Sequence, residues 1–147
     1  PSGCVLDVAC GDGRHANWLA SLGFRVFAVD REASQGLSRE VSFTLADLES
    51  GPWPYASQQF DAVIVTNYLH RPLFGAIMGA VSPGGLLIYE TFAVGNERYG
   101  RPSRPDYLLR PGELLDVVRE KMTVIGYEHG YVAQPKEAVV QRLAARR

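Results

Sequence analysis

Four aspartates surround a short glycine turn in the first third of the chain, and their side chains could bind a cation, an amine or sugar hydroxyls. The turn, residues 11–16, reads GDGRHA and fits the Gly-x-Gly-x-x-Gly/Ala pattern, in which the backbone turns sharply and comes close to a ligand. Alone, this pattern is weak evidence, because generic strand-to-helix turns share it. The four acids are Asp7, Asp12, Asp30 and Asp47.

The negative charge of these side chains discriminates between the ligands that such a turn could hold. A dinucleotide brings a pyrophosphate, which favours bare backbone N–H groups at a helix start and which carboxylates would repel. S-adenosylmethionine has no phosphate. It carries a sulfonium, an ammonium group, a ribose diol and an adenine amino group, and carboxylates complement most of these. The acid set therefore favours the sulfonium donor over NAD.

The elements that must position these acids follow from the hydrophobic pattern. Short apolar runs alternate with segments of helical period over the first ninety residues, which predicts βαβ units and a mainly parallel sheet. Ligands bind beyond the carboxyl ends of such strands, so Asp30 and Asp47, each at a strand end, are expected beside the turn. Strands are expected at residues 4–8, 25–29, 41–45, 60–65 and 86–89, helices at 14–22 and 72–81, a loop at 49–59 and a tight turn at 82–85.

The pattern breaks between residues 93 and 111, which contain several glycines, prolines and arginines. Such a long irregular excursion is usually functional or mobile. Helical period returns at residues 113–120, and two further strands are expected at 123–128 and 138–143.

Composition points to one ordinary globular domain spanning residues 1–147, with 46% hydrophobic and 21% charged residues. The net charge of −1 gives no global field that would attract nucleic acid.

Cys4 and Cys10 match neither a zinc nor a redox spacing, so reduced thiols and no metal are expected. Because no run approaches the roughly 20 apolar residues that span a bilayer, we expect a soluble cytoplasmic protein. The sequence begins with Pro1 and not with methionine, and the first strand follows almost at once, so we expect something upstream to be missing.

Several segments of the first ninety residues resemble the motifs of a known enzyme family. Residues 5–13, VLDVACGDG, resemble motif I of class I S-adenosylmethionine-dependent methyltransferases, with Ala9 in place of the first glycine. Residues 26–30 are similar to the family's strand-two acid segment, 45–48 to its adenine-binding segment, 60–65 to motif IV, and 83–88 to the following turn and strand. Within the family, residues 10–15 and 109–114 are similar to small bacterial tellurite-resistance-type methyltransferases.

The resemblance implies a Rossmann-like, doubly wound α/β fold, with a mainly parallel seven-stranded sheet whose last strand is antiparallel. It implies methyl transfer from S-adenosylmethionine, leaving S-adenosylhomocysteine. Because members of the family usually have helices before the first strand, it also implies that upstream helices are missing here. Residues 66–69, TNYL, lack the Asp/Asn-Pro-Pro-aromatic tetrad of enzymes that methylate nucleic-acid amines, which disfavours that substrate class. A small-molecule acceptor is therefore expected. The implied cofactor-binding residues are Asp7, Ala9, Cys10, Gly11, Gly13, Asp30, Arg31, Asp47, Leu48 and Asn67.

Two groups of residues are candidates for the chemistry of transfer. His70 follows the fourth strand and could act as a general base, although a lone histidine is more often structural. As a group, the arginines and tyrosines of the excursion predict a lid that recognises an anionic acceptor. For each arginine taken singly, the alternative is that it belongs to an ordinary solvated surface loop. The candidate acceptor-binding residues are Tyr68, Arg98, Arg101 and Tyr107, with Tyr99, Arg104 and Arg110 in the same group.

Asp7 needs a partner of its own, because a carboxylate within an apolar strand must be paired or hydrogen-bonded to stay ionised. We expect it to orient the turn or to receive the methionine ammonium, directly or through water.

Two alternatives to methyl transfer stay open: a NAD-dependent oxidoreductase that uses the same glycine turn, and a module that binds the cofactor without turnover. RNA methylation is not favoured by charge or by a basic aromatic stripe. The oligomeric state is not determined by the sequence.

Overall fold

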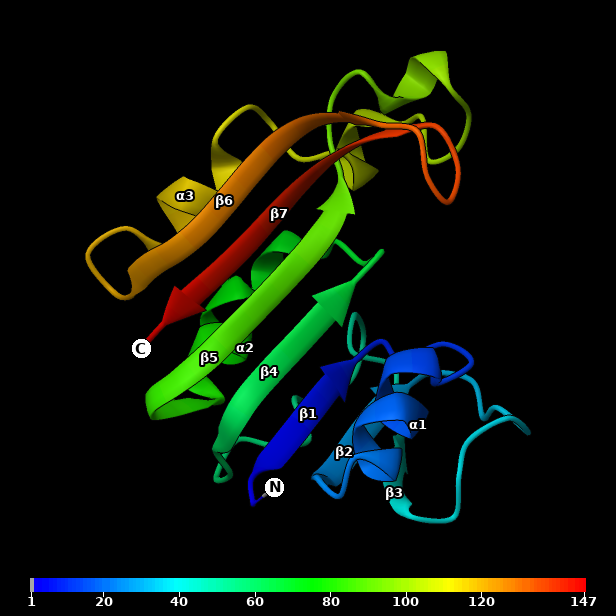
Figure 1. The fold of residues 1–147 in the computed structure, drawn as a ribbon, viewed down its shortest axis with the longest axis vertical. Coiled ribbons are helices and arrows are strands. Elements are labelled where there is room, and N and C mark those ends of the chain that lie inside the picture. Colours follow the sequence, from blue (N-terminus) through cyan, green and yellow to red (C-terminus); the bar gives the residue numbers. More distant parts are fainter. Residues whose placement is uncertain (1) are drawn as a thin grey trace.

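The computed structural model describes residues 2–147, so that Pro1 lies outside the described residues, and it shows a seven-stranded sheet with helices on both faces (Figure 1). The strand order is β3-β2-β1-β4-β5-β7-β6, and β7 alone runs antiparallel to the others. The predicted fold class is therefore confirmed, including the antiparallel last strand. The strands are β1 (Cys4–Val8), β2 (Arg25–Asp30), β3 (Val41–Leu45), β4 (Phe60–Thr66), β5 (Val81–Phe92), β6 (Thr123–Val132) and β7 (Ala138–Arg146).

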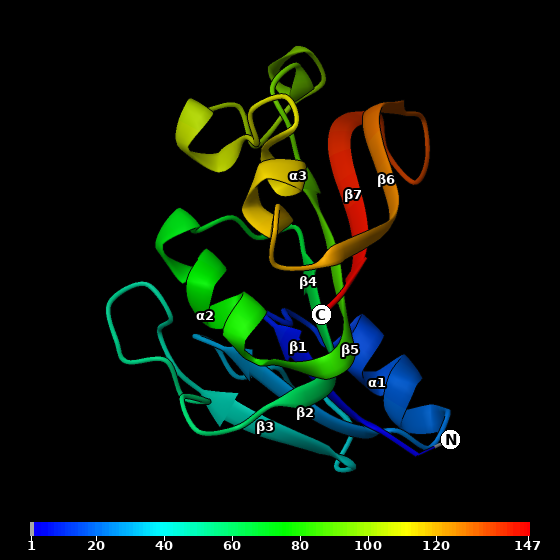
Figure 2. The same ribbon diagram turned by 90° about the vertical axis from the view of Figure 1, so that its left-hand side faces the viewer.

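Three α-helices cover the sheet, with α1 on one face and α2 and α3 on the other (Figure 2). They are short, and three 3₁₀ turns of three residues each lie in the connections between strands. The helices are α1 (Arg14–Ser21), α2 (Phe74–Gly79) and α3 (Glu113–Val118), and the 3₁₀ turns are Arg71–Leu73, Asn96–Arg98 and Pro105–Tyr107. None of the helices within residues 2–147 has the length and apolar character needed to cross a bilayer.

The central strand β1 explains why the core forms on both faces. All five of its residues are buried, and alternate side chains point to opposite faces of the sheet. Val5 packs into the cluster under α1 with Leu19, whereas Leu6 packs into the larger cluster under α2 and α3 with Phe60. A strand buried on both faces reads as a continuous apolar run, which is why its boundaries were predicted correctly.

Strand β5 is the main departure from the expected boundaries. Residues 82–85, expected as a turn, form an irregularity inside β5, between the pairs Phe60–Val81 and Ala62–Leu86. At its other end β5 continues to Phe92, because β7 pairs with it and satisfies polar residues that break the apolar pattern. Glu90, for example, lies opposite Arg142 and accepts its Nε at 2.7 Å. Pairing between β6 and β7 likewise extends both strands beyond the predicted ends.

The helices are shorter than expected. The segment predicted as a helix over 72–81 begins as the 3₁₀ turn and is α-helical only from Phe74 to Gly79. The predicted helix 113–120 ends at Val118, where Glu120 adopts a left-handed backbone with φ of 61°. The predicted helix 14–22 ends one residue early, at Ser21.

The irregular excursion after β5 is held to the sheet by buried polar side chains. Asn96 Oδ1 accepts the amide of Val139 at 3.1 Å, and Gln141 Nε2 donates to the carbonyl of Arg110 at 2.7 Å. Both side chains are at most 2% exposed. These bonds tie the two ends of the excursion to β7, so the segment lies over the carboxyl ends of β4 and β5 as a fixed part of the fold.

A second anchor joins the excursion to the segment after β4. Arg71 makes two bonds to the Glu113 carboxylate, at 2.7 and 2.9 Å, and donates to the carbonyls of Asp106 and Leu108. Burial alone would raise the pKa of Glu113, but the bonds from Arg71 and from the Arg110 amide outweigh it and lower that pKa. The Arg71–Glu113 pair therefore holds the backbone in place at the residues before and after Tyr107.

Candidate functional site

The turn after β1 adopts conformations that only small residues accept easily. Ala9, Gly11 and Gly13 have φ values of 53°, 54° and 78°. A Cβ added at Gly13 would lie 2.4 Å from Leu37 Cδ2, so this glycine serves close packing. A Cβ at Gly11 would meet nothing within 4 Å, so the backbone there faces open space that a ligand can approach.

Asp30 joins the end of β2 to this turn. Its Oδ2 accepts the amide of Gly11 at 2.9 Å, and its Oδ1 accepts the amide of Glu32 at 3.1 Å. The amide of Cys10 also donates to the carbonyl of Val29. These bonds fix the carboxylate in place, and each of its oxygens keeps a lone pair that can accept a ligand hydroxyl.

Asp7 lies behind the turn as a buried carboxylate with no bonded partner. Its side chain is 1% exposed, and neither carboxylate oxygen has a hydrogen bond of acceptable geometry within the described residues. Burial raises the pKa of Asp7 to about 6, against partial lowering by the amide of Ala16 and the charge of Arg14. An unpaired buried carboxylate is costly, so its position favours a site for a cationic ligand group.

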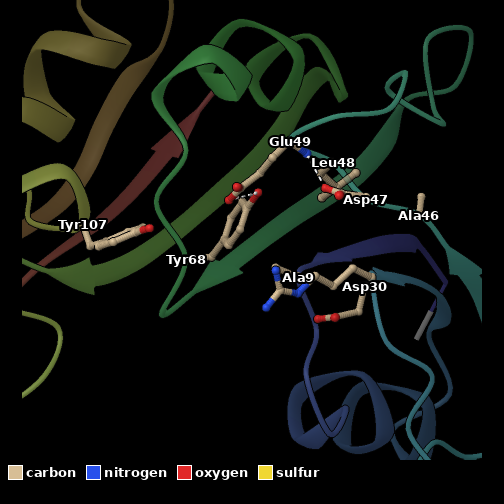
Figure 3. Close-up of a pocket in the computed structure, with 9 residues that line it drawn as sticks. Ala9, Asp30, Ala46, Asp47, Leu48, Glu49, Tyr68 and Tyr107 are labelled. Atoms are coloured by element: carbon tan, nitrogen blue, oxygen red, sulfur yellow. Dashed lines mark hydrogen bonds between the residues drawn. The ribbon is translucent and has the colours of Figure 1, made fainter.

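A first cavity of about 300 Å³ opens at the carboxyl ends of β2 and β3. Figure 3 shows Asp30 and Asp47 reaching this cavity from neighbouring elements, with Tyr68 pointing toward Glu49. Asp47 is exposed and accepts the Ser50 hydroxyl at 2.8 Å, and this bond, with the amide of Glu49, lowers its pKa. The cavity is lined by Ala9, Asp30, Arg31, Ala46, Asp47, Leu48, Glu49, Tyr68 and Tyr107.

Tyr68 separates this cavity from the ends of β4 and β5. Its hydroxyl lies 3.5 Å from Glu49 Oε1, and its backbone carbonyl accepts the Tyr89 hydroxyl at 2.8 Å. Burial and the nearby Glu49 raise the pKa of Tyr68 to about 12. Tyr68 therefore stays a neutral hydroxyl at neutral pH.

Two further cavities continue the first one along the same sheet edge. A bridging cavity shares Glu49, Tyr68 and Tyr107 with the first cavity and adds Asn67 and Phe92. A distal cavity shares Asn67 and Phe92 with the bridging cavity. The distal cavity is lined by Arg14, Asn67, Glu90, Phe92, Asn96, Tyr99, Gly100, Arg101, Val132, Gln134, Pro135, Lys136, Glu137, Ala138, Val140 and Arg142.

The structure brings most of the sequence-predicted residues to this edge. Those on the first cavity are Ala9, Asp30, Arg31, Asp47, Leu48, Tyr68 and Tyr107, while Asp7, Cys10, Gly11 and Gly13 form the strand and turn beside it. Asn67 lines both other cavities, and Arg101 and Tyr99 line the distal one. Burial raises the pKa of the Cys10 thiol to about 12, which leaves it unreactive.

Other predicted residues lie apart from these cavities. His70 lines none of the three, and its Nδ1 lies 4.0 Å from Glu49 Oε1. Arg98 and Arg104 also line none of them, and Arg104 lies 3.8 Å from Asp106. Arg110 borders a separate hollow with Glu113, and Asp12 is exposed outside the cavities.

Several lining residues were missed by the sequence reasoning. Ala46 and Glu49 flank the predicted Asp47–Leu48 pair and could have been found from that position. Lys136 reaches the distal cavity from the β6–β7 hairpin, and no local motif signals this. Within residues 2–147, no three His, Cys, Asp or Glu side chains are grouped as a metal would require.

Comparisons with known proteins identify the class that this fold and site define. A family model described as a methyltransferase domain matches residues 5–85, and the chain belongs to that family. The predicted family is therefore confirmed, and with it S-adenosylmethionine as the cofactor of that class. The nicotinamide oxidoreductase alternative is not favoured.

Individual relatives agree with this family. An uncharacterized methyltransferase of Mycobacterium tuberculosis is 35% identical over 109 residues, covering 66% of this chain and 54% of the relative. The chain spans about half the length of the curated relatives that it matches.

Solved structures agree in fold. TehB from Haemophilus influenzae superposes with a TM-score of 0.80 at 16% identity, covering 99% of this chain and 58% of TehB, in agreement with the predicted likeness to tellurite-resistance-type methyltransferases. A Burkholderia thailandensis 1,6-didemethyltoxoflavin-N1-methyltransferase, solved with bound 1,6-didemethyltoxoflavin and S-adenosylhomocysteine, superposes with a TM-score of 0.72 at 18% identity, covering 99% of this chain and 71% of that enzyme. Identities this low establish the fold alone.

Proposed function

We propose that this chain binds S-adenosylmethionine across the carboxyl ends of β1, β2 and β3 and catalyses transfer of its methyl group to a small anionic acceptor. One observation carries the proposal. Three carboxylates, Asp30, Asp47 and Glu49, line one cavity beside the open face of Gly11, and a fourth, the unpaired Asp7, is buried behind that turn. This arrangement suits a ligand with hydroxyl, amino and cationic groups and repels a pyrophosphate.

Three parts of the cofactor, its ribose, its adenine and its methionine ammonium, have candidate partners among these residues. Asp30 would accept the ribose hydroxyls with the lone pairs that the backbone leaves free. Asp47 and the buried Leu48 would hold the adenine at the other side of the first cavity. Asp7 would receive the methionine ammonium, directly or through water, which would compensate its burial.

The chain's own contribution to the reaction is chiefly to position the two reactants. S-adenosylmethionine supplies a methyl group on a sulfonium, which is already an activated leaving group. Bound side by side at near-attack distance, donor and acceptor react without the entropy cost of an encounter. Tyr68 and Asn67 stand between the first and distal cavities and would line the point of transfer.

A general base is needed only when the atom that receives the methyl group carries a proton that must be removed. We propose His70 as the candidate base, because it lies just beyond β4 with its Nδ1 4.0 Å from Glu49, a residue of the first cavity. Histidine is the side chain most often used as a general base in enzymes.

Turnover of an acceptor panel tests the proposal. The protein is incubated with S-adenosylmethionine and with oxyanions of tellurium and selenium, thiols, small acids and their neutral analogues, and release of S-adenosylhomocysteine is measured. We expect release above background with at least one anionic acceptor. Cofactor binding with background turnover for every acceptor would instead identify a binding module, and a preference for neutral or cationic acceptors would overturn the anionic assignment.

A further inference from the structure

Cations outnumber carboxylates in the lining of the distal cavity. Four cations and two carboxylates line it, namely Arg14, Arg101, Lys136, Arg142, Glu90 and Glu137. Both carboxylates already have partners in the fold. Glu90 accepts Arg142 Nε at 2.7 Å, and Glu137 accepts the Tyr131 hydroxyl at 2.9 Å. Positive charge is therefore in excess at this cavity.

Three of these cations, Arg14, Arg101 and Lys136, have no carboxylate partner within salt-bridge distance among the described residues, and the last two lie on one wall of the cavity. These two come from segments remote in sequence, the excursion and the β6–β7 hairpin, and Lys136 Nζ lies 3.7 Å from the Cβ position at Gly100, next to Arg101. The fold thus brings two uncompensated cations to the same wall of one cavity, which favours an anionic ligand.

The rest of the lining fits a compact carbon body that lies close to the methyl donor. Phe92 and Val140 supply apolar surface, and Asn67 connects the distal cavity to the bridging one. Arg14 begins α1 directly after the glycine turn, so the near end of the cavity adjoins the proposed cofactor. The volume of about 240 Å³ is below the roughly 300–1,000 Å³ of drug-sized sites, in keeping with a small ligand.

We propose that the distal cavity is the acceptor subsite and that it takes a small organic carboxylate. Its carboxylate binds Arg101 and Lys136, its carbon body packs on Phe92 and Val140, and its nucleophilic atom points toward Asn67. The acceptor's lone pair forms the bond to the methyl carbon while the carbon–sulfur pair returns to sulfur, and a proton on the acceptor atom leaves to water or a base. This assignment rests on the proposed methyl transfer.

Matched pairs of acids and amides test the assignment. The probes are salicylate with salicylamide and thioglycolate with thioglycolamide, whose members differ chiefly in charge. Dissociation constants are measured on the protein loaded with S-adenosylhomocysteine, and initial rates with S-adenosylmethionine. Because bonds from cationic donors to a carboxylate are lost in the amide, we expect at least one acid to bind about tenfold or more tightly than its amide.

Substitutions assign this preference to the two cations. In the double variant Lys136→Met, Arg101→Met the ratio of acid to amide affinity should fall close to one, while affinity for S-adenosylhomocysteine changes less than about twofold. Arg104→Met is the matched control, because this arginine belongs to the same excursion but does not line the cavity, and it should keep the ratio.

Three results would overturn the assignment: no acid binding to the loaded protein, an acid preference that survives in the double variant, or a parallel loss of cofactor affinity. The last result would mean that the two cations hold the cofactor's own carboxylate. Failure of the proposed function itself would look different, because the wild-type protein would then bind no S-adenosylhomocysteine.

Discussion

Replacing Asp7 with asparagine should stabilise the free protein and weaken its hold on the cofactor. The side chain is 1% exposed and its carboxylate oxygens have no bonded partner among the described residues, so its charge costs folding energy until a cation arrives. Asparagine keeps the shape and removes the charge. The two effects have opposite signs, which a general loss of packing would not produce.

The size of the folding cost follows from the pKa of Asp7, which burial raises from 3.8 to about 6. At about 1.4 kcal/mol per pH unit, ionisation of this group destabilises the free protein by about 3 kcal/mol at pH 7. The sign is set by the folded state, which binds the proton more tightly than the unfolded chain. The contribution of Asp7 to the unfolding free energy therefore rises as pH falls from about 6 toward 4.

Urea unfolding of the wild type and of Asp7→Asn, at a series of pH values from 4 to 8, measures this cost. We expect the variant to be the more stable protein at pH 7 by about 1–3 kcal/mol, since the buried amide loses part of the gain to its own unmet hydrogen bonds. The difference should shrink toward pH 4. Calorimetry with S-adenosylhomocysteine should show a loss of about tenfold to a hundredfold in affinity.

Asp12→Asn is the matched control, because Asp12 belongs to the same turn but is exposed and does not line the cavities. It should leave both stability and affinity nearly unchanged. Equal pH dependence of unfolding in the wild type and Asp7→Asn, or unchanged cofactor affinity in Asp7→Asn, would refute the reasoning.

Three further perturbations separate cofactor binding, stability and chemistry. Gly11→Ala and Gly84→Ala both place a Cβ in open space at positive φ, so each should lower the unfolding free energy in urea by about 1 kcal/mol. Only Gly11→Ala should also lower cofactor affinity. Equal cofactor affinities in the two variants would refute a ligand at that turn. Glu113→Gln should cost about 1–3 kcal/mol, against less than about 0.5 kcal/mol for the exposed Asp116→Asn. Because the pKa of Glu113 is lowered, its contribution is present above about pH 4.5 and is lost as pH falls below that value, and a constant difference down to pH 3 would contradict this. His70→Gln should lower kcat about a hundredfold with a protonated acceptor and leave KM for the cofactor unchanged, and an unchanged kcat would show that His70 is not the base.

The parallel half of the sheet and the grouping of residues around the glycine turn could be predicted because local chemistry specifies them. Strand β1 reads as one apolar run, and the turn after it needs small residues at Ala9, Gly11 and Gly13. Asp30 lies at a strand end that the parallel topology brings to the same edge. These features depend on short stretches of sequence.

The distal cavity and the excursion could not be predicted in the same way, because their arrangement depends on pairing between remote segments. Glu90 interrupts the apolar pattern of β5 and gains its partner only when β7 pairs alongside. Asn96 and Gln141 look like surface residues in the sequence, yet both are buried and hold the excursion to the sheet. Lys136 reaches the distal cavity only through the β6–β7 hairpin.

Calorimetric titration of the wild type and of Asp30→Ala with S-adenosylmethionine and NAD, in parallel, tests the central claim most directly. Carboxylates grouped at the glycine turn should give saturable binding of S-adenosylmethionine to the wild type, no saturable binding of NAD, and a loss of about tenfold or more in Asp30→Ala. Saturable binding of NAD, or S-adenosylmethionine affinity that Asp30→Ala leaves unchanged, would contradict it.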